Sequence, residues 1–328
     1  MTVGQSLDDE FLTAADPYRR ELLAHCYRMT GSIHDAEDLL QETFVRAWRG
    51  YPKFDGRSSI RTWLHRIATN TCLTALESRA RRPLPTGLGA PSSDPSDDLV
   101  ERREVPWLEP IPDSMVWGDG RGADDPATVV GARESVRLAF VAALQHLSAR
   151  QRAVLVLRDV LQWKAAEVAE ALGTTPAAVN SLLQRARAQL AEATPTPDTL
   201  VEPESEATRE LLHRYVDGFE RYDIDGLVEL FTRDAIWEMP PFVGWYVGGA
   251  DIARLVKEKC PSEGPGDMRL LPAAANGQPA LGLYMRGEDG VHRPFQLHVL
   301  DITERGVAHV TCFFDTDLFT RFGLPERL

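Results

Sequence analysis

DAEDLLQETFVRAWRGYPKFDGRSSIRTWLHRIATN, residues 35–70, contains two amphipathic helices joined by a glycine-containing turn. The apolar positions of the first helix recur with the helical period and predict one buried stripe: Ala36, Leu39, Leu40, Phe44 and Ala47. Ser32, with Asp35 three residues later, predicts the N-cap and a capping box. The other side is acidic and polar: Asp35, Asp38, Gln41, Glu42 and Arg46. This side either docks on a protein or is the solvated side of a bundle helix.

The second helix is expected to begin after Ser58 and Ser59, which are good N-cap residues. Five side chains are expected to pack inward: Ile60, Trp63, Leu64, Ile67 and Ala68. Six others are expected to point outward: Arg61, Thr62, His65, Arg66, Thr69 and Asn70. Cations neutralise phosphates and short polar groups read base edges, so this face suits a nucleic acid strand. The preceding loop PKFDGRSS is suited to an unstacked base. The alternative is a basic helix that is merely soluble.

A second DNA-reading pattern, EVAEALGTTPAAVNSLLQRARAQL, occupies residues 167–190. A short helix is followed by Gly173, which permits a tight turn, and by Thr175 and Pro176, which favour the start of a new helix. The pattern predicts a helix-turn-helix with its recognition helix at 176–190. A plain helical hairpin is the alternative. Asn180 is placed for a bidentate contact to adenine, worth about 1–3 kcal/mol of discrimination.

The net charge of the chain is −13, but the charge is unevenly distributed. Residues 46–82 carry nine basic and two acidic side chains, a local net charge of +7. Residues 197–328 carry 13 basic and 23 acidic side chains, a net charge of −10. Because counterion release depends on the cations at the phosphate contact, the local surplus matters more than the total. The C-terminal part is therefore a poor candidate for nucleic acid binding.

The N-terminal residues lack the basic start and apolar core of a signal peptide. No apolar run approaches the roughly 18–20 residues that cross a bilayer. The four cysteines show no metal-binding spacing: Cys26, Cys72, Cys260 and Cys312. We therefore expect reduced thiols, no metal and no cofactor, in a cytoplasmic protein without membrane contact.

Changes in composition and periodicity divide the chain. Residues 83–133 are rich in proline and acidic side chains, and residues 194–205 also lack apolar periodicity, so both are interpreted as linkers. Beyond them, β-rich runs occur at 235–239, 281–287, 294–302 and 307–314. The predicted fold is multidomain, with two all-α domains and a C-terminal α+β domain: residues 11–82, 134–193 and 206–328.

The motifs at residues 35–49 and 54–70, together with LSARQRAVLVLRDV and the pattern at 167–190, resemble bacterial sigma-70-type factors of the extracytoplasmic-function group. The resemblance covers residues 11–193 and implies a factor that binds core RNA polymerase and directs promoter-specific initiation of transcription. Docking on the β′ clamp helices is implied for Asp35, Asp38, Leu39, Gln41 and Glu42. Capture of the melted −10 element is implied for Phe54, Arg57, Ser58, Ser59, Arg61, Thr62, His65, Arg66 and Asn70. Reading of the −35 element, with the domain on the β flap, is implied for Thr175, Pro176, Ala178, Asn180, Ser181, Gln184, Arg185 and Arg187.

Two features qualify this resemblance. Many members carry Lys or Arg where Asn180 stands, and here only Arg185 and Arg187 are obvious phosphate partners, so we expect modest −35 affinity. Residues 94–125 carry ten acidic and three basic side chains, a net charge of −7. This segment either threads the cationic active-site channel of the polymerase or is a plain disordered tether.

The C-terminal part is expected to begin with helices at 206–221 and 224–232 and to contain another at 250–259. This order resembles the cone-shaped SnoaL-like and NTF2-like domains, and the whole chain resembles sigma factors of the sigma-G type. Some relatives with this fold are enzymes, and the candidate pocket residues are Trp237, Glu238, Tyr284, Arg286, His298, Asp301 and Asp315. Because strand side chains alternate, Gln296 and His298 share a face, as do Tyr284 and Arg286, whereas His298 and Asp301 do not.

The sequence leaves three roles open for residues 206–328: a small-molecule enzyme, a ligand sensor and a protein-contact domain. We expect cis regulation of the factor, because a short linker gives effective concentrations in the mM range and the acidic surface suits the basic helix around Arg57–Arg66. An anti-sigma factor or a small-molecule ligand is a further candidate partner. The alternative function is a DNA-binding module fused to a SnoaL-like enzyme. A conventional repressor has no need for the acidic face at 35–42.

Overall fold

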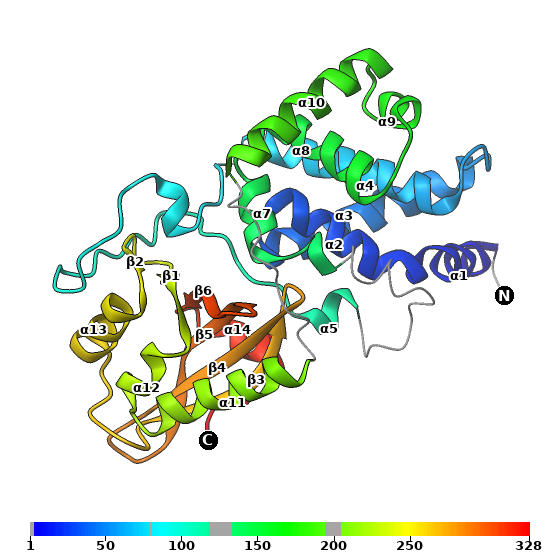
Figure 1. Cartoon of the computed structure of the whole chain (residues 1–328). Helices are drawn as coiled ribbons and strands as arrows, with labels where there is room; N and C mark the ends of the chain where they lie inside the picture. The colour runs from blue at the N-terminus through cyan, green and yellow to red at the C-terminus, as the bar shows by residue number, and fades with distance from the viewer. Residues whose placement is uncertain (1–2, 79, 118–132, 194–204) are drawn as a thin grey trace. The chain divides into compact units, whose positions relative to one another are not determined.

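The computed structural model describes residues 3–78, 80–117, 133–193 and 205–328, which belong to two compact units (Figure 1). The first unit comprises the chain up to Arg82 and Leu108–Pro195. The second comprises Pro83–Trp107 and the chain from Thr196 onward. In these described parts, no helix combines the length and apolar character needed to cross a bilayer.

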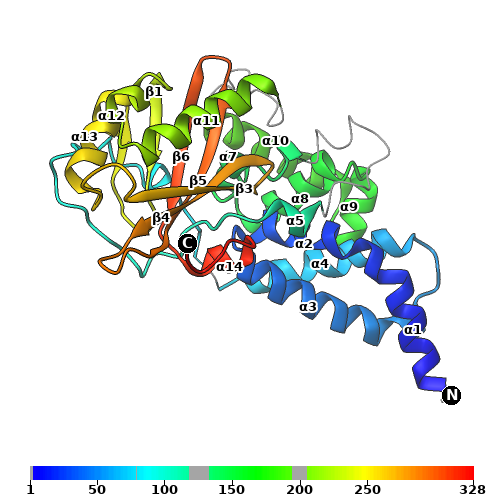
Figure 2. The ribbon, with the colours of Figure 1, turned by 90° about the horizontal axis from the view of Figure 1, so that it is seen from below.

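The first unit is entirely helical in its described regular structure, as predicted. Its helices are α1 (Val3–Ala15), α2 (Arg19–Thr30), α3 (Ile33–Gly50), α4 (Ile60–Leu76), α5 (Asp113–Val116), α7 (Leu138–Leu144), α8 (Ala149–Leu155), α9 (Ala165–Ala171) and α10 (Pro176–Ala193). Helices α2, α3 and α4 pack side by side (Figure 2). The predicted apolar stripe of α3 is fully buried, which confirms the helical period.

The predicted N-caps are also confirmed. Ser32 Oγ accepts from Asp35 N at 3.1 Å, Ser59 Oγ accepts from Thr62 N at 3.1 Å, and Thr175 Oγ1 accepts from Ala178 N at 3.2 Å. Each bond satisfies a backbone N–H that has no partner within its helix. Gly173 has φ of +59°, a conformation that glycine adopts without strain, between α9 and α10.

Glu109 fixes the start of α3. Its Oε2 accepts from Ser32 Oγ at 2.8 Å and Ile33 N at 3.0 Å, and lies 3.0 Å from His34 Nδ1. Its backbone N–H donates to Gly31 O at 3.0 Å. A carboxylate at a helix N-terminus interacts favourably with the unpaired N–H groups and the helix dipole. This contact holds the chain after Trp107 against the first unit.

Polar contacts also join the two helical halves of this unit, which are α1–α4 and α7–α10. Arg152 of α8 donates to Gln145 Oε1 at 2.8 Å and to Met29 O at the end of α2. Arg28 of α2 donates to Ser135 Oγ at 2.7 Å. Burial lowers the pKa of both arginines to about 10, so both stay charged at neutral pH. Buried, hydrogen-bonded guanidinium groups therefore connect the two halves.

The second unit combines helices with one mixed sheet. Its helices are α11 (Glu206–Glu220), α12 (Ile224–Val228), α13 (Gly249–Lys259) and α14 (Asp317–Arg321). Its strands are β1 (Phe231–Glu238), β2 (Trp245–Val247), β3 (Met268–Ala275), β4 (Gln278–Arg286), β5 (His292–Thr303) and β6 (Gly306–Phe313). The sheet has six strands within residues 205–328, in the order β2-β1-β6-β5-β4-β3. This confirms the predicted α+β class.

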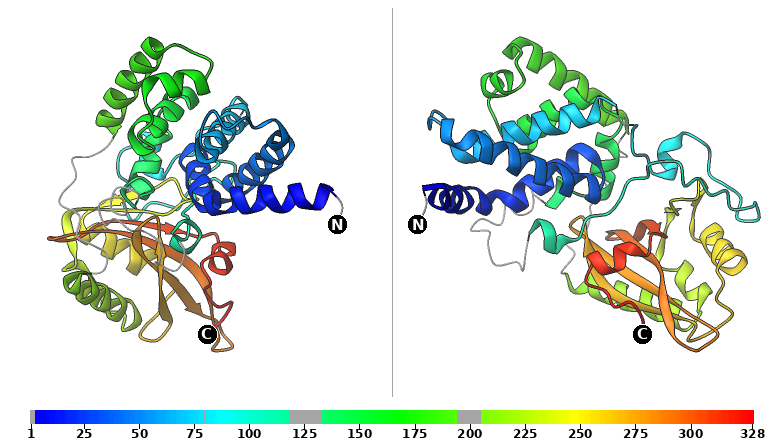
Figure 3. Two further views of the ribbon diagram at one scale, coloured as in Figure 1. Left: turned by 90° about the vertical axis from the view of Figure 1, so that its right-hand side faces the viewer. Right: turned by 180° about the vertical axis from the view of Figure 1, so that it is seen from behind.

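Only the β1–β6 pair of neighbouring strands is parallel; the other pairs described are antiparallel. Helices α11 and α13 lie on one face and α14 on the other (Figure 3, left). The first face carries the apolar core, which includes Trp237, Leu281, Leu300 and Val310. The predicted end of the second helix at 232 is wrong, because α12 ends at Val228 and β1 begins at Phe231.

Residues 83–107 form an ordered segment on the second unit, which we term the strap. Ser93 N donates to Trp245 O at 2.8 Å, and Trp245 Nε1 donates to Ala90 O at 3.1 Å. Val243 N donates to Val100 O at 3.0 Å, and Arg102 N donates to Pro241 O at 2.9 Å. Backbone pairing of this kind extends the sheet edge near β2 and holds the strap along it.

A buried carboxylate holds the start of the strap. Glu238 Oε2 accepts from Thr86 N at 3.0 Å, and its Oε1 lies 2.8 Å from His309 Nε2. Burial alone would lower the pKa of His309, but the Glu238 carboxylate outweighs it and raises that pKa. Glu238 is fully buried, so its hydrogen bonds are made without competition from water. Further along, Leu99 packs against the apolar core of the unit.

Candidate functional sites

The acidic face of α3 remains largely exposed. Asp38, Gln41 and Glu42 are exposed, and Glu42 accepts from Arg46 at 2.7 Å one turn away. Leu39 is buried in the helical core. Asp35 accepts from Arg82 Nη2 at 2.8 Å, in a network that includes Glu109. The described surface offered by this helix is therefore centred on Asp38, Gln41 and Glu42.

The loop before α4 is open to solvent. Arg57 and Ser59 are exposed, and Phe54 and Ser58 are partly buried. The Phe54 ring lies 5.0 Å from the Trp63 ring, which fixes the loop against the helix. The loop thus rests on the Phe54–Trp63 ring contact and presents Arg57 and polar groups to solvent.

The prediction that His65 and Thr69 point outward is wrong. Both are fully buried, and Thr69 Oγ1 lies 3.0 Å from His25 Nε2. Helix α2 covers this side of α4, and the His65 and Trp163 rings lie 6.4 Å apart. The periodicity of α4 predicts that its polar side is exposed. It cannot reveal that this polar side packs on a neighbouring helix.

Glu21 of α2 anchors this buried polar cluster. Arg61 Nε donates to Glu21 Oε2 at 2.9 Å, and His65 Nε2 lies 3.2 Å from Glu21 Oε1. Burial would raise the pKa of Glu21, but the neighbouring His65 and Arg61 outweigh it and lower the pKa to about 2. Burial lowers the pKa of His65 and, more strongly, that of His25. Arg61 is therefore engaged within the protein rather than presented alone to solvent.

The C-terminal half of α4 contacts the helix-turn-helix. Asn70 Nδ2 donates to Ala171 O at the end of α9 at 3.3 Å. Arg66 Nη1 lies 3.7 Å from Glu170 Oε1. The remaining predicted member, Thr62, is partly buried beside its cap, Ser59. In this arrangement two of the predicted −10 residues, Arg66 and Asn70, contact α9, whereas the loop at 54–59 is open to solvent.

Helix α10 keeps its predicted reading face accessible. Exposed positions on it or at its cap are Thr175, Pro176, Asn180, Ser181, Gln184, Arg185 and Arg187. Ala178 is partly buried. Arg187 Nη2 donates to Asp159 Oδ1 at 2.7 Å, and this partner raises its pKa. Val179, Leu183 and Ala186 are buried on the opposite side, as the helix-turn-helix pattern predicts.

The predicted C-terminal pocket residues do not all lie in one site. Trp237 and His298 face the apolar core, with ring centroids 5.4 Å apart. Glu238 binds the strap, and Asp301 accepts from Gln278 Nε2 at 2.9 Å.

Three further candidates lie elsewhere. Tyr284 packs on Phe319 of α14 and donates to Pro325 O at 2.8 Å. Arg286 is exposed, so the predicted shared face with Tyr284 brings no pair together. Asp315 accepts from Asp317 N at 3.1 Å at the surface. Ordinary strand alternation divides the candidates between the two faces of the sheet, since Trp237 faces the apolar core and Tyr284 faces α14.

Two residues outside the predicted site join Trp237 and His298. Tyr215 of α11 lies with its hydroxyl 2.9 Å from His298 Nδ1, and Gln296 is buried two positions before His298 on the same strand face. The shared face of Gln296 and His298 agrees with the alternation expected from the sequence. Tyr215 gives no comparable sequence signal, because its partner lies 83 residues away.

Three protein-family models match the chain. "Sigma-70 region 2" matches residues 15–82, "Sigma-70, region 4" matches residues 137–190, and the "SnoaL-like domain" matches residues 212–311. The last match confirms the fold that the C-terminal pattern resembles.

Relatives cover the whole arrangement. The ECF RNA polymerase sigma factor SigG of Mycobacterium tuberculosis (strain H37Rv) is 66% identical over 320 residues, which are 97% of this chain and 85% of that protein. SigJ of the same organism is 30% identical over 94% of this chain and 93% of its own length. The crystal structure of SigJ is similar with a TM-score of 0.63 and 25% identity, covering 96% of this chain and all of that one.

The exposed face of α10 predicts that Asn180 reads a base. Asn180→Ala should cost about 1–3 kcal/mol of discrimination at one base pair and leave the salt dependence unchanged. Arg185→Ala is the matched comparison, because loss of a phosphate partner weakens binding to all sequences and lowers the salt slope by about 1. Competition binding of the polymerase-bound protein to randomised upstream promoter fragments measures both effects. A uniform loss for Asn180→Ala across all sequences would exclude base reading by this side chain.

Proposed function

Because the chain belongs to the extracytoplasmic-function group of RNA polymerase sigma factors, we propose that α3 docks on core polymerase, that the 54–70 region captures the opened −10 strand, and that the C-terminal unit regulates both in cis. Initiation of transcription is the role of the family. The individual contacts and the regulation are the parts that we infer.

The exposed acidic face of α3 is the observation that carries the docking proposal. Asp38 and Glu42 lie one turn apart with Gln41 between them, on the side opposite the buried stripe. Their backbone is held by the cap at Ser32 and by Glu109, so the face is rigid before binding. A rigid charged face lowers the entropy cost of association and steers the encounter electrostatically.

Reversal of this charge is the direct test. The double variant Asp38→Lys/Glu42→Lys should weaken association with core polymerase at least about tenfold, because like charges would replace complementary ones. A binding titration with labelled core polymerase measures the loss.

The matched control is Glu304→Lys/Glu326→Lys, which makes the same change of net charge at two exposed residues of the C-terminal unit. Unchanged association of the α3 variant, or an equal loss in the control, would contradict docking through α3.

The strap supports the proposal of cis regulation. Its residues join the α4 region to the helix-turn-helix region, yet they are bonded to the C-terminal unit through Thr86, Ser93, Val100 and Arg102. A segment held along a sheet edge is unavailable to enter the polymerase channel. We infer that transcription requires release of the strap.

A disulfide that locks the strap tests this regulation. A Cβ built on Gly244 would lie 3.6 Å from Ser93 Cβ, which is within the usual range for a disulfide. Ser93→Cys/Gly244→Cys should lose most of its promoter-specific run-off transcription when oxidised and regain it when reduced. Cys26, Cys72 and Cys312 are buried and should not compete for the new thiols, and Cys260, which is partly exposed, is replaced by Ser in all the variants compared.

The controls are the two single-cysteine variants under the same oxidising and reducing conditions, which should show no redox effect. Transcription by the fully cross-linked protein at the reduced protein's level would contradict the proposed release.

The alternative of a small-molecule enzyme finds less support. His298 Nδ1 is bonded to Tyr215, while the carboxylates of Glu238 and Asp301 serve other partners on the opposite sheet face. General acid–base catalysis needs such groups within hydrogen-bond reach of one substrate. The geometry therefore favours a regulatory role for this unit over catalysis.

A further inference from the structure

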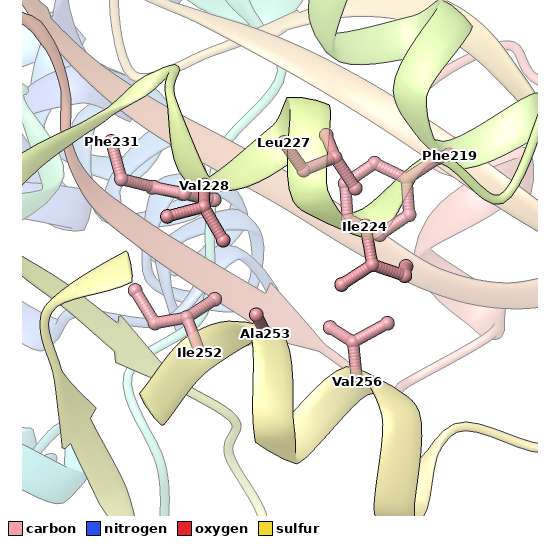
Figure 4. A pocket seen from close by; sticks show the side chains of 8 residues that line it. All are labelled: Phe219, Ile224, Leu227, Val228, Phe231, Ile252, Ala253 and Val256. Carbon is pink, nitrogen blue, oxygen red and sulfur yellow. The ribbon is translucent and has the colours of Figure 1, made fainter. Parts of the chain in front are cut away.

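A small apolar cavity lies between α12 and α13 in the second unit. Figure 4 shows Ile252, Ala253 and Val256 of α13 on one side of it, facing residues of α11 and α12. Its volume is about 10 Å³, which holds one water-sized sphere, and the described side chains that line it are apolar. The cavity therefore offers no polar group that would select a ligand. A polar contact without an assigned role lies instead in the first unit, on the recognition helix.

Asp159 and Arg187 form a two-point ion pair between the turn after α8 and the recognition helix α10. Arg187 Nε donates to Asp159 Oδ2 at 2.9 Å, and Arg187 Nη2 donates to Asp159 Oδ1 at 2.7 Å. A carboxylate that accepts two parallel N–H bonds fixes the plane of the guanidinium group. The pair therefore sets the orientation of the Arg187 side chain as well as balancing its charge.

The backbone around Asp159 departs from a regular helix. Residues Val156–Val160 form a turn of π-helix, in which Leu161 N donates to Val156 O at 2.9 Å. Gln162 then has φ of +58°, which residues with a Cβ rarely adopt, and its Nε2 donates to Asp159 O at 2.6 Å. Such π-turns and strained conformations are frequent at functional sites. This irregular turn places the Asp159 carboxylate against α10.

Stability of the fold does not account for this pair. The side chains of Asp159 and Arg187 are 30% and 60% exposed. Exposed ion pairs contribute little to folding, because water and salt screen the charges and both side chains lose freedom. The buried side of α10, at Val179, Leu183 and Ala186, already holds this helix in the helical core. A role in binding is therefore the better explanation of the pair.

Arg187 lies on the side of α10 that is expected to read DNA. Asn180, Gln184 and Arg187 are exposed and are spaced four and three residues apart, so they follow one stripe along the helix. A guanidinium group has five N–H donors, and the bonds to Asp159 use two of them. The N–H groups that remain lie on Nη1 and Nη2, along the edge away from the carboxylate. Two donors on one edge match the oxygen atoms of a phosphate.

We propose that Asp159 is a positioning residue for promoter binding, which holds the guanidinium group of Arg187 so that its remaining edge meets a backbone phosphate of the upstream promoter element. The pair orders a long side chain in the free protein, so this ordering does not have to occur when DNA binds. Asp159 thereby favours DNA binding although its own charge repels phosphates. The inference rests on α10 facing promoter DNA, and it adds a residue that acts through Arg187.

Asp159→Asn distinguishes positioning from charge repulsion, because the two effects have opposite signs. Repulsion alone predicts tighter DNA binding when the negative charge is removed. Positioning predicts binding that is about twofold to tenfold weaker, which is the cost of ordering one long side chain, with an unchanged salt dependence. Titration of the polymerase-bound protein with upstream promoter fragments at several salt concentrations measures both quantities. The loss should occur without a change in the midpoint of thermal unfolding.

Arg187→Ala tests the phosphate contact itself. It should weaken binding to all sequences and lower the salt slope by about 1, because one phosphate contact is lost. When Arg187→Ala is already present, Asp159→Asn should cause no further loss. The matched control is Glu170→Gln, which removes the same charge from an exposed carboxylate of α9 that lies near Arg66 of α4. This control should not weaken DNA binding.

Unchanged or tighter binding by Asp159→Asn would overturn the positioning role, and so would an equal loss in Glu170→Gln. An equal loss from Asp159→Asn in the presence of Arg187→Ala would overturn it as well, because Asp159 would then act on the fold rather than through Arg187. No effect of Arg187→Ala on DNA binding would remove the premise too, because this stripe of α10 would then not meet DNA.

Discussion

Two carboxylates, Glu109 and Glu238, determine the path of the chain between the two helical halves. Glu109 accepts from the start of α3, and Glu238 accepts from Thr86 at the start of the strap. Both accept backbone N–H groups, which are positioned by the fold rather than by a flexible side chain. A segment rich in proline and acidic residues thereby becomes a fixed part of the structure. The free-energy cost of ordering it is offset by these bonds and by burial of Leu99 and Leu108.

The first unit is held closed by contacts suited to opening. Arg28 and Arg152 join its halves through hydrogen bonds to the Ser135 hydroxyl and the Met29 carbonyl, and Asn70 adds one to Ala171. Such groups regain hydrogen bonds to water when the halves separate, so the net cost per bond is about 0.5–1.5 kcal/mol. An interface of this kind can be stable in the free protein and yet give way to a large partner surface. The open face of α10 is available in either state.

Local patterns predicted the elements with strong periodicity. The stripe from Ala36 to Ala47, the cap at Ser32 and the turn at Gly173 are confirmed because each depends on neighbours within a few residues. The helical and β-rich runs of the sequence also predict the α+β class of residues 206–328. Strand β3, with a proline and several alanines, was not predicted, because its pairing with β4 rather than its own composition makes it a strand.

These local patterns could not predict contacts between segments that are distant in the sequence. His65 and Thr69 have the polarity of an exposed face but are covered by His25, which lies 40 or more residues earlier. The strap has the composition of a tether, and it is ordered by distant groups, namely the backbone of residues 241–245 and the Glu238 carboxylate. The cluster of Tyr215, Trp237 and His298 requires a helix and two strands to meet. Polar side chains with distant partners are thus the features that single-sequence reasoning misplaces.

Hydrogen–deuterium exchange of the full-length free protein tests the central claim most directly, which is that residues 83–117 are folded onto the two units. The amides of Thr86, Ser93, Arg102 and Glu109 donate to protein acceptors and should exchange at least about a hundredfold more slowly than the same peptides unfolded. Exchange of these four amides at the rate of an unstructured chain, while the amides of β5 remain protected, would contradict the account.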